Sequence, residues 1–140
     1  MASKGAVRKN AVSTPDVWGN FVRCSIDHWE EHIVDPLDGH PELTGREKEV
    51  EQAILDPDLI RPSTATGRAF AFERRGTADE IRVVVSYQEP DLIRQGGTSG
   101  WVSTAYPIDF AYSSQVGVPI YRKSATKGAA LSQTEEEKKP

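Results

Sequence analysis

The apolar positions in the central part of the chain change their spacing once, from the spacing of helices to that of strands. Residues 27–34 and 44–55 place apolar side chains three and four residues apart, as amphipathic helices do. Asp27 and Thr44 are each followed three residues later by a glutamate, which is the spacing of an N-terminal capping box. The sequence therefore predicts two helices, the second of which ends before Pro57.

Beyond Pro57 the sequence has the pattern of β-strands. Four segments are rich in β-branched and aromatic residues and are separated by turn-forming residues: 59–61, 68–74, 81–87 and 101–106. Helices followed by a run of strands with short connections are typical of the α+β class. We therefore expect N-terminal helices packed on a roughly four-stranded antiparallel β-sheet. The expected core residues are Ile54, Phe70, Val83, Val85 and Trp101.

The chain length of 140 residues favours one domain, flanked here by two polar tails. Residues 1–17 are small, polar and basic without a periodic pattern, so we expect a disordered N-terminal tail there. Residues 123–140 contain almost no large apolar side chain and end in a run of charges, which predicts a disordered C-terminal tail. The folded domain should span residues 18–122 and begin with a strand-like segment at residues 21–24.

Composition and charge restrict the classes of function. A formal net charge of −4 disfavours broad nonspecific binding to nucleic acid, although a local basic stripe remains compatible with it. The single cysteine, Cys24, excludes an intramolecular disulfide and a cysteine metal cluster. No apolar run approaches the roughly 18 residues of a membrane span, and residues 1–10 lack the apolar stretch of a signal peptide. We therefore expect a cytoplasmic protein without a membrane partner.

All three histidines, His28, His32 and His40, fall within thirteen positions. Imidazole can give or take a proton near neutral pH, so their clustering suggests a chemical site, although helix-borne histidines also serve as surface or packing residues. Residues 28–32 fit the H-x-x-E-H signature, in which two histidines one helical turn apart hold zinc. A zinc-dependent hydrolase would need a third ligand, which His40 could supply only if the intervening loop folded back. We therefore favour a site without a metal or cofactor.

Metal-free cleavage of RNA uses these residue types more completely. Attack by the 2′-hydroxyl needs a base, an acid for the 5′-oxygen, and a cation that stabilises the charge on the phosphate. Histidine can carry either proton, and arginine presents a fork of donors to phosphate oxygens. Hydroxyl groups of Thr and Tyr can hold a nonbridging oxygen. The predicted strands carry Arg68, Arg74, Thr104 and Tyr106, so the sheet could form the floor of such a site.

Short motifs also follow one another in a characteristic order. They are W-x-x-H-I at residues 29–33, H-P-E-L at 40–43, an aliphatic pattern over 50–60, aromatic residues with arginine at 70–74, V-V-V at 83–85 and T-A-Y at 104–106. This order resembles a phage-associated RelE-like nuclease domain of the barnase–EndoU–colicin E5/D–RelE superfamily. The resemblance covers nearly the whole expected domain.

The resemblance implies a small metal-independent endoribonuclease, found in toxin or phage-conflict settings, that acts on RNA and can be held by an antitoxin or immunity protein. Carried over by position, it implies that the catalytic residues are His32, His40, Arg74, Thr104 and Tyr106. The alternative is a noncatalytic binding module on the same fold, which the acidic net charge favours. In that case Arg74 is a solvated sheet residue, and His40 only shapes its loop.

Overall fold

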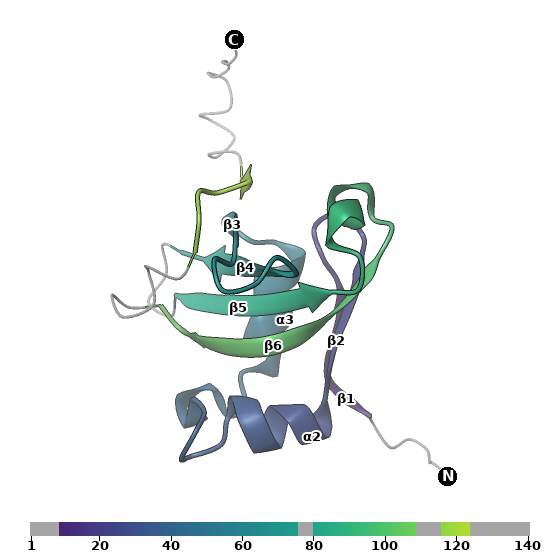
Figure 1. The fold of residues 1–140 in the computed structure, drawn as a ribbon. Helices are drawn as coiled ribbons and strands as arrows, with labels where there is room; N and C mark the ends of the chain where they lie inside the picture. The colour runs from purple at the N-terminus through teal and green to yellow at the C-terminus, as the bar shows by residue number, and fades with distance from the viewer. Residues whose placement is uncertain (1–8, 76–79, 109–115, 124–140) are drawn as a thin grey trace.

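The structure is a computed structural model that describes residues 9–75, 80–108 and 116–123. Within them, seven β-strands form one sheet in the order β1-β2-β6-β5-β4-β3-β7 (Figure 1). The strands are β1 (Asn10–Pro15), β2 (Phe21–Ser25), β3 (Leu59–Pro62), β4 (Ala69–Arg74), β5 (Ile81–Tyr87), β6 (Ser99–Pro107) and β7 (Tyr121–Arg122). The helical segments are α2 (Ile26–His28) with its π-helical continuation η1 (Trp29–Ile33), the 3-10 helices η2 (Pro41–Leu43) and η3 (Pro90–Gln95), and α3 (Glu47–Leu55).

The sheet is mixed, and the predicted four-stranded antiparallel sheet is wrong. β3, β4, β5 and β6 pair antiparallel with one another, but β2 pairs parallel with the start of β6. The antiparallel hairpin of β1 and β2 extends the sheet on one side, and β7 extends it beyond β3. The helices expected at the N-terminus therefore follow two strands rather than open the domain.

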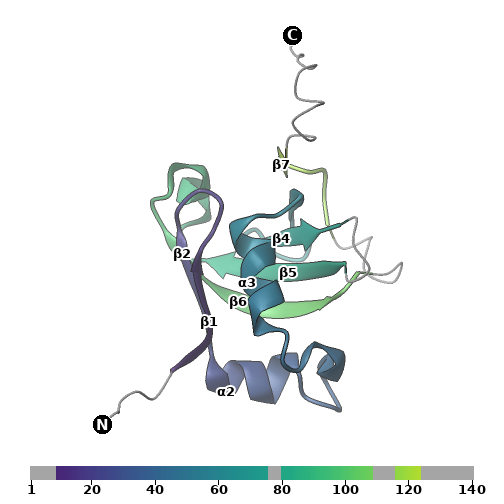
Figure 2. The same cartoon turned by 180° about the vertical axis from the view of Figure 1, so that it is seen from behind.

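β1 lies inside the segment expected to be a disordered tail. Val12 is fully buried, and Ala11 and Thr14 are almost completely buried. β1 pairs with β2 along its length and packs against α3 (Figure 2). Its sequence contains few apolar residues, so the local pattern is weak. The strand forms because β2 and α3 together offer it hydrogen bonds and an apolar surface.

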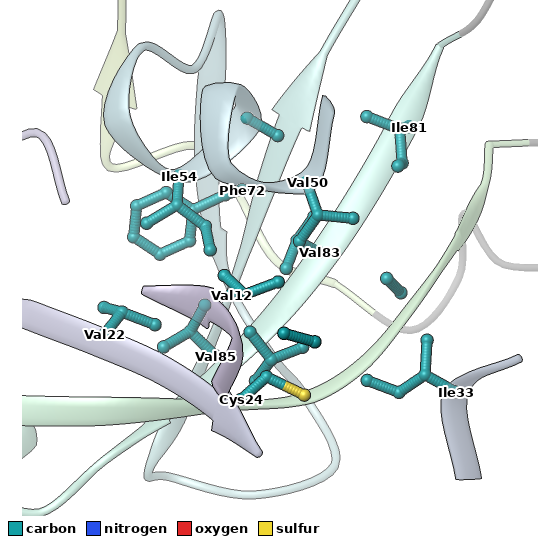
Figure 3. Packing of buried hydrophobic residues seen from close by; sticks show 14 of the residues in the cluster. Val12, Val22, Cys24, Ile33, Val50, Ile54, Phe72, Ile81, Val83 and Val85 are labelled. Atoms are coloured by element: carbon teal, nitrogen blue, oxygen red, sulfur yellow. The ribbon is translucent and has the colours of Figure 1, made fainter. Parts of the chain in front are cut away.

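α3 covers one face of the sheet and closes the hydrophobic core (Figure 2). Figure 3 shows Val50 and Ile54 of α3 above Phe72 of β4 and Val83 of β5. All four side chains are fully buried. Val12 of β1 lies among them, so the core is shared between the N-terminal hairpin and the central strands.

Three of the five predicted core residues, Ile54, Val83 and Val85, are fully buried, and the prediction is confirmed for them. Phe70 is partly buried and packs against the core cluster. Trp101 is 41% exposed, so its assignment to the core is wrong. It lies beside Arg23 of β2 on the face away from α3.

Both predicted helices form, but neither begins at the predicted cap. In the first, the side chain of Ser25 rather than Asp27 accepts a hydrogen bond from the backbone N–H of His28. The second begins at Glu47, while Thr44 donates its hydroxyl hydrogen bond to the carbonyl of Pro41. None of the helices in the described ranges is long and apolar enough to cross a bilayer.

A buried hydrogen-bond network holds the turn between β1 and β2 against the rest of the domain. The Asp16 carboxylate accepts hydrogen bonds from the Tyr87 hydroxyl at 2.7 Å and from the Asn20 side chain at 2.9 Å. Asn20 also donates to the carbonyl of Ile93 and accepts from the backbone of Thr98. Burial, and then the charge and hydrogen bond of Asp16, raise the pKa of Tyr87, so its hydroxyl remains a donor.

Candidate functional site

The two faces of the central sheet have different chemistry. Phe72, Val83 and Ala105 face α3 and belong to the core, whereas the strand positions beside them point to the opposite face. On that face Glu73 of β4, Arg82 of β5 and Tyr106 of β6 occupy directly opposed positions. Figure 1 views the sheet with α3 behind it, so this face is turned toward the reader.

Arginines from three segments surround the Glu73 carboxylate. Arg82 donates to its Oε2 through Nε and Nη2, each at 2.8 Å. Arg75 donates to Oε1 at 2.9 Å, and Arg61 Nε lies 3.4 Å from Oε2. Glu73 and Arg82 are buried, whereas the Arg61 and Arg75 side chains are 24% and 38% exposed. The carboxylate thus orients Arg75 and Arg82 through hydrogen bonds and forms an ion pair with Arg61. The side chains of Arg61 and Arg75 reach solvent.

Tyr106 continues this cluster toward β6. Arg82 Nη1 lies 3.4 Å from the Tyr106 hydroxyl, and the guanidinium carbon is 5.7 Å from the centre of the Tyr106 ring. Thr104, two residues earlier on β6, shares this face by strand alternation and is partly exposed. We call this surface the arginine–tyrosine face. It consists of Arg61, Glu73, Arg75, Arg82, Thr104 and Tyr106.

His40 lies next to Tyr106, with 5.5 Å between the two ring centres. Its backbone N–H donates to the carbonyl of Ile33, which folds the segment after η1 back along the helix. Its Nδ1 is 3.8 Å from a carboxylate oxygen of Glu42, and its side chain is 22% exposed. Gly39 makes this return possible, because a Cβ there would lie 2.5 Å from the carbonyl oxygen of His32.

His32 lies against His28, with 5.0 Å between the ring centres. His28 Nε2 lies 3.0 Å from the carbonyl oxygen of Ser103 on β6, and a carbonyl only accepts, so this nitrogen carries the proton. A zinc ion at these two histidines would compete with that hydrogen bond. Among the described residues, no group of three or more His, Cys, Asp or Glu side chains is placed to hold a metal.

Arg74 is on the other side of the sheet from Tyr106. Its Nη1 is 3.6 Å from the Asp56 carboxylate and donates to the Asp56 carbonyl at 3.2 Å, at the C-terminal end of α3. Strand alternation explains this position, because Arg74 shares the α3 face with Phe72. Of the five residues implied by the resemblance, His40 contacts Tyr106, and Thr104 shares a face of the sheet with Tyr106. His32 instead stacks on His28, and Arg74 pairs with Asp56 on the opposite face.

The residue patterns of the sequence did not indicate a role for four charged residues of this face: Arg61, Glu73, Arg75 and Arg82. The signal was a charged residue inside an apolar strand, as in I-R-V-V-V-S-Y, where alternation places Arg82 and Val84 on one face. A buried arginine in that position requires a carboxylate partner, and Glu73 is the acidic residue of the neighbouring strand. The sequence alone did not show which strands are neighbours in the sheet.

Cys24 is not a nucleophile in this arrangement. Its side chain is buried in the core, and burial raises the pKa of the thiol to about 12. Comparisons of the chain with protein-family models, curated proteins and solved structures found no match. The chemistry of this protein is therefore inferred from the arginine–tyrosine face and from the imidazole beside it.

Proposed function

We propose that the protein is a small metal-independent endoribonuclease whose active site is the arginine–tyrosine face with His40. The observation that supports it is the convergence of an imidazole, a phenol hydroxyl and arginine side chains within one region of the sheet. These are the proton carriers and cations that cleavage through the 2′-hydroxyl requires. The substrate is RNA, and the activity requires no cofactor.

In the proposed reaction His40 removes the proton of the 2′-hydroxyl, and the 2′-oxygen forms a bond to phosphorus. The bond from phosphorus to the 5′-oxygen breaks, and Tyr106 gives its hydroxyl proton to that oxygen. Arg82 contacts the hydroxyl and the ring of Tyr106, so its guanidinium stabilises the negative charge that develops on the Tyr106 oxygen. Thr104 holds a nonbridging oxygen from the same face. The products are a 2′,3′-cyclic phosphate and a 5′-hydroxyl end.

The resemblance to RelE-like nuclease domains supports the same reaction class. Three residues that it implies, His40, Thr104 and Tyr106, belong to the proposed site. The roles of His32 and Arg74 are not retained, because His32 stacks on His28 and Arg74 pairs with Asp56. Membership of that superfamily, a cytoplasmic location and inhibition by an antitoxin or immunity protein are part of the proposal.

The test is incubation of the purified protein with end-labelled RNA in the presence of EDTA. We expect cleavage with 2′,3′-cyclic phosphate ends, and His40→Ala should reduce its rate by about 10²–10⁴-fold. Tyr106→Phe, which removes only the hydroxyl, should reduce the rate as well. His32→Ala is the matched control and should cleave at nearly the wild-type rate, because the proposed reaction uses no proton carried by His32, which stacks on His28. Equal losses in His32→Ala and His40→Ala would contradict this site.

A noncatalytic binding module remains the second candidate, and one observation favours it. Glu73 and Arg82 are 0% and 1% exposed, so their ion pair also serves as a purely structural element of the sheet. A wild-type protein that never cleaves RNA, while all variants stay folded, would favour this second function. Binding of the same RNA without cleavage would then identify the ligand.

A further inference from the structure

A concave surface lies at the other end of β6 from Tyr106, where β2, α2 and β6 meet. It encloses about 220 Å³, and its lining includes Arg23, Cys24, Ser25, His28 and Trp101. Trp101 and Arg23 occupy directly paired positions on the parallel strands β6 and β2. Both side chains are exposed, Trp101 to 41%. This cavity, which we call the Trp101 cavity, therefore combines an accessible indole with a neighbouring guanidinium group.

Among the described residues, neither Arg23 nor His28 of this cavity forms an ion pair with an acidic side chain. Within the part of the chain that the structure describes, Arg23 takes part in no ion pair or side-chain hydrogen bond. His28 uses Nε2 for the Ser103 carbonyl, which leaves its ring edge in the cavity lining. An indole face beside an unneutralised guanidinium is suited to a flat ring that carries a phosphate, and a nucleotide has both.

This cavity and the proposed active site lie on the same face of the sheet. Trp101 is opposite Ser86, and Ser86 shares its face with Arg82, which is opposite Tyr106. Ser103 is the extra residue of a β-bulge between these two regions, and its hydroxyl bonds to that of Ser86. At about 3.3 Å per residue, Trp101 and Tyr106 are about 16 Å apart along β6. That distance fits a few nucleotides of extended RNA.

We propose that the Trp101 cavity is a nucleotide-binding subsite for single-stranded RNA. One base stacks on the Trp101 ring, and Arg23 binds the adjacent phosphate. The strand then follows the outer face of β6 to His40 and Tyr106. This inference rests on the proposed function, since it names where the substrate is held several nucleotides away from the cleaved bond. A duplex would not expose a base for stacking, so the subsite selects unpaired RNA.

The test is fluorescence anisotropy with a short labelled single-stranded RNA whose 2′-hydroxyls are methylated, so that it cannot be cleaved. Trp101→Ala should weaken binding about 5- to 150-fold, the range expected for loss of one stacked base. Trp101→Phe should keep most of the affinity, because it preserves an aromatic face. Leu55→Ala is the control, since Leu55 is 42% exposed on α3 and lies away from this face.

Arg23→Gln should weaken binding and lower the dependence of log Kd on log salt concentration by about 0.7, the value for one phosphate contact on a single strand. Arg122→Gln on β7 is the charge-matched control and should leave that dependence unchanged. Thermal unfolding of each variant checks that it is folded. Double-stranded RNA of the same sequence should bind more weakly, and equal binding of both forms would contradict base stacking.

The results of these experiments distinguish a failure of this subsite from a failure of the proposed function. If Trp101→Ala binds the RNA as tightly as the wild type while His40→Ala abolishes cleavage, the subsite is wrong and the nuclease assignment stands. If binding depends on Trp101 but the wild type never cleaves RNA, the subsite stands and the nuclease assignment is wrong. A wild type that binds no single-stranded RNA overturns the subsite.

Discussion

Glu73 determines the geometry of the arginine–tyrosine face, because its buried carboxylate forms ion pairs with Arg61, Arg75 and Arg82. Replacing it by leucine would leave the buried guanidinium of Arg82 without this partner. Removing one member of a buried ion pair costs about 3–5 kcal/mol, so we expect Glu73→Leu to lower the free energy of unfolding by that amount. Urea denaturation measures the loss.

The control for Glu73 is Glu49→Gln. Glu49 pairs with Arg46 on the surface of α3 and is 50% exposed. An exposed pair contributes roughly 0–1 kcal/mol, so this variant should unfold at nearly the wild-type urea concentration. Similar losses in the two variants would mean that burial of the Glu73 cluster does not determine its contribution.

The thiol of Cys24 and the hydroxyl of Tyr87 are buried, and both should make the free energy of unfolding decrease in alkaline solution. Burial raises the pKa of Cys24 from 9.0 to about 12, and burial with Asp16 raises that of Tyr87 above 10.0. Above pH 9 the unfolded chain therefore releases protons that the folded chain retains, which favours unfolding. The free energy of unfolding should be constant near pH 8 and decrease as the pH rises above 9.

Cys24→Ala isolates one of these two groups. The substitution removes the thiol, so the decrease in unfolding free energy between pH 9 and 10, where Cys24 is the first to titrate in the unfolded chain, should be smaller than in the wild type. Urea titrations at pH 8, 9 and 10 measure this difference. An unchanged slope would mean that the buried thiol does not contribute to the pH dependence.

Among the secondary-structure elements, β1 is the one whose contribution departs most from the expectation of a disordered tail. Val12 is fully buried between β2 and α3, so Val12→Ala removes two methyl groups from a packed core. The loss of buried apolar groups and the cavity left behind should together cost about 2 kcal/mol. Val118→Ala is the same change at a residue that is 79% exposed, and it should cost almost nothing. Thermal unfolding distinguishes the two.

Elements with strong local patterns could be predicted from the sequence, and elements formed by tertiary contacts could not. Alternation located β3 to β6 within one or two residues, and the helical spacing of Val50, Ala53 and Ile54 located α3. β1 has a short polar sequence whose burial depends on β2 and α3. The parallel pairing of β2 with β6 has no local signal, because it joins segments that are distant in the sequence.

The same distinction applies to the candidate site. The pairing of His40 with Tyr106 follows a loop that returns along η1, and the order of motifs indicated both residues without indicating their contact. The face occupied by Arg74 could be read from strand alternation, but whether that face was the covered one depended on where α3 packs. The exposure of Trp101 could not be predicted for the same reason, because it also depends on which face of the sheet α3 covers.

At the scale of the whole molecule, the domain is joined by contacts between its early and late segments. The N-terminal hairpin pairs with β6, its turn is held by Tyr87 through Asp16, and β7 pairs with β3. The core and both proposed sites therefore depend on the complete sheet. His28, next to β2, lines the Trp101 cavity, while His40 lies beside Tyr106 at the far end of β6.

The parallel pairing of β2 with β6 also affects how the chain is made. Residues 21–23 leave the ribosome well before residues 99–101, to which they bind in the sheet. At about 5–20 residues per second, the N-terminal hairpin waits roughly 4–16 s for its partner strand. During that interval β2 presents an unpaired edge, and such an edge can bind another chain. Synthesis is thus a period in which this edge is open to aggregation, and a chaperone that covers nascent strands would act there.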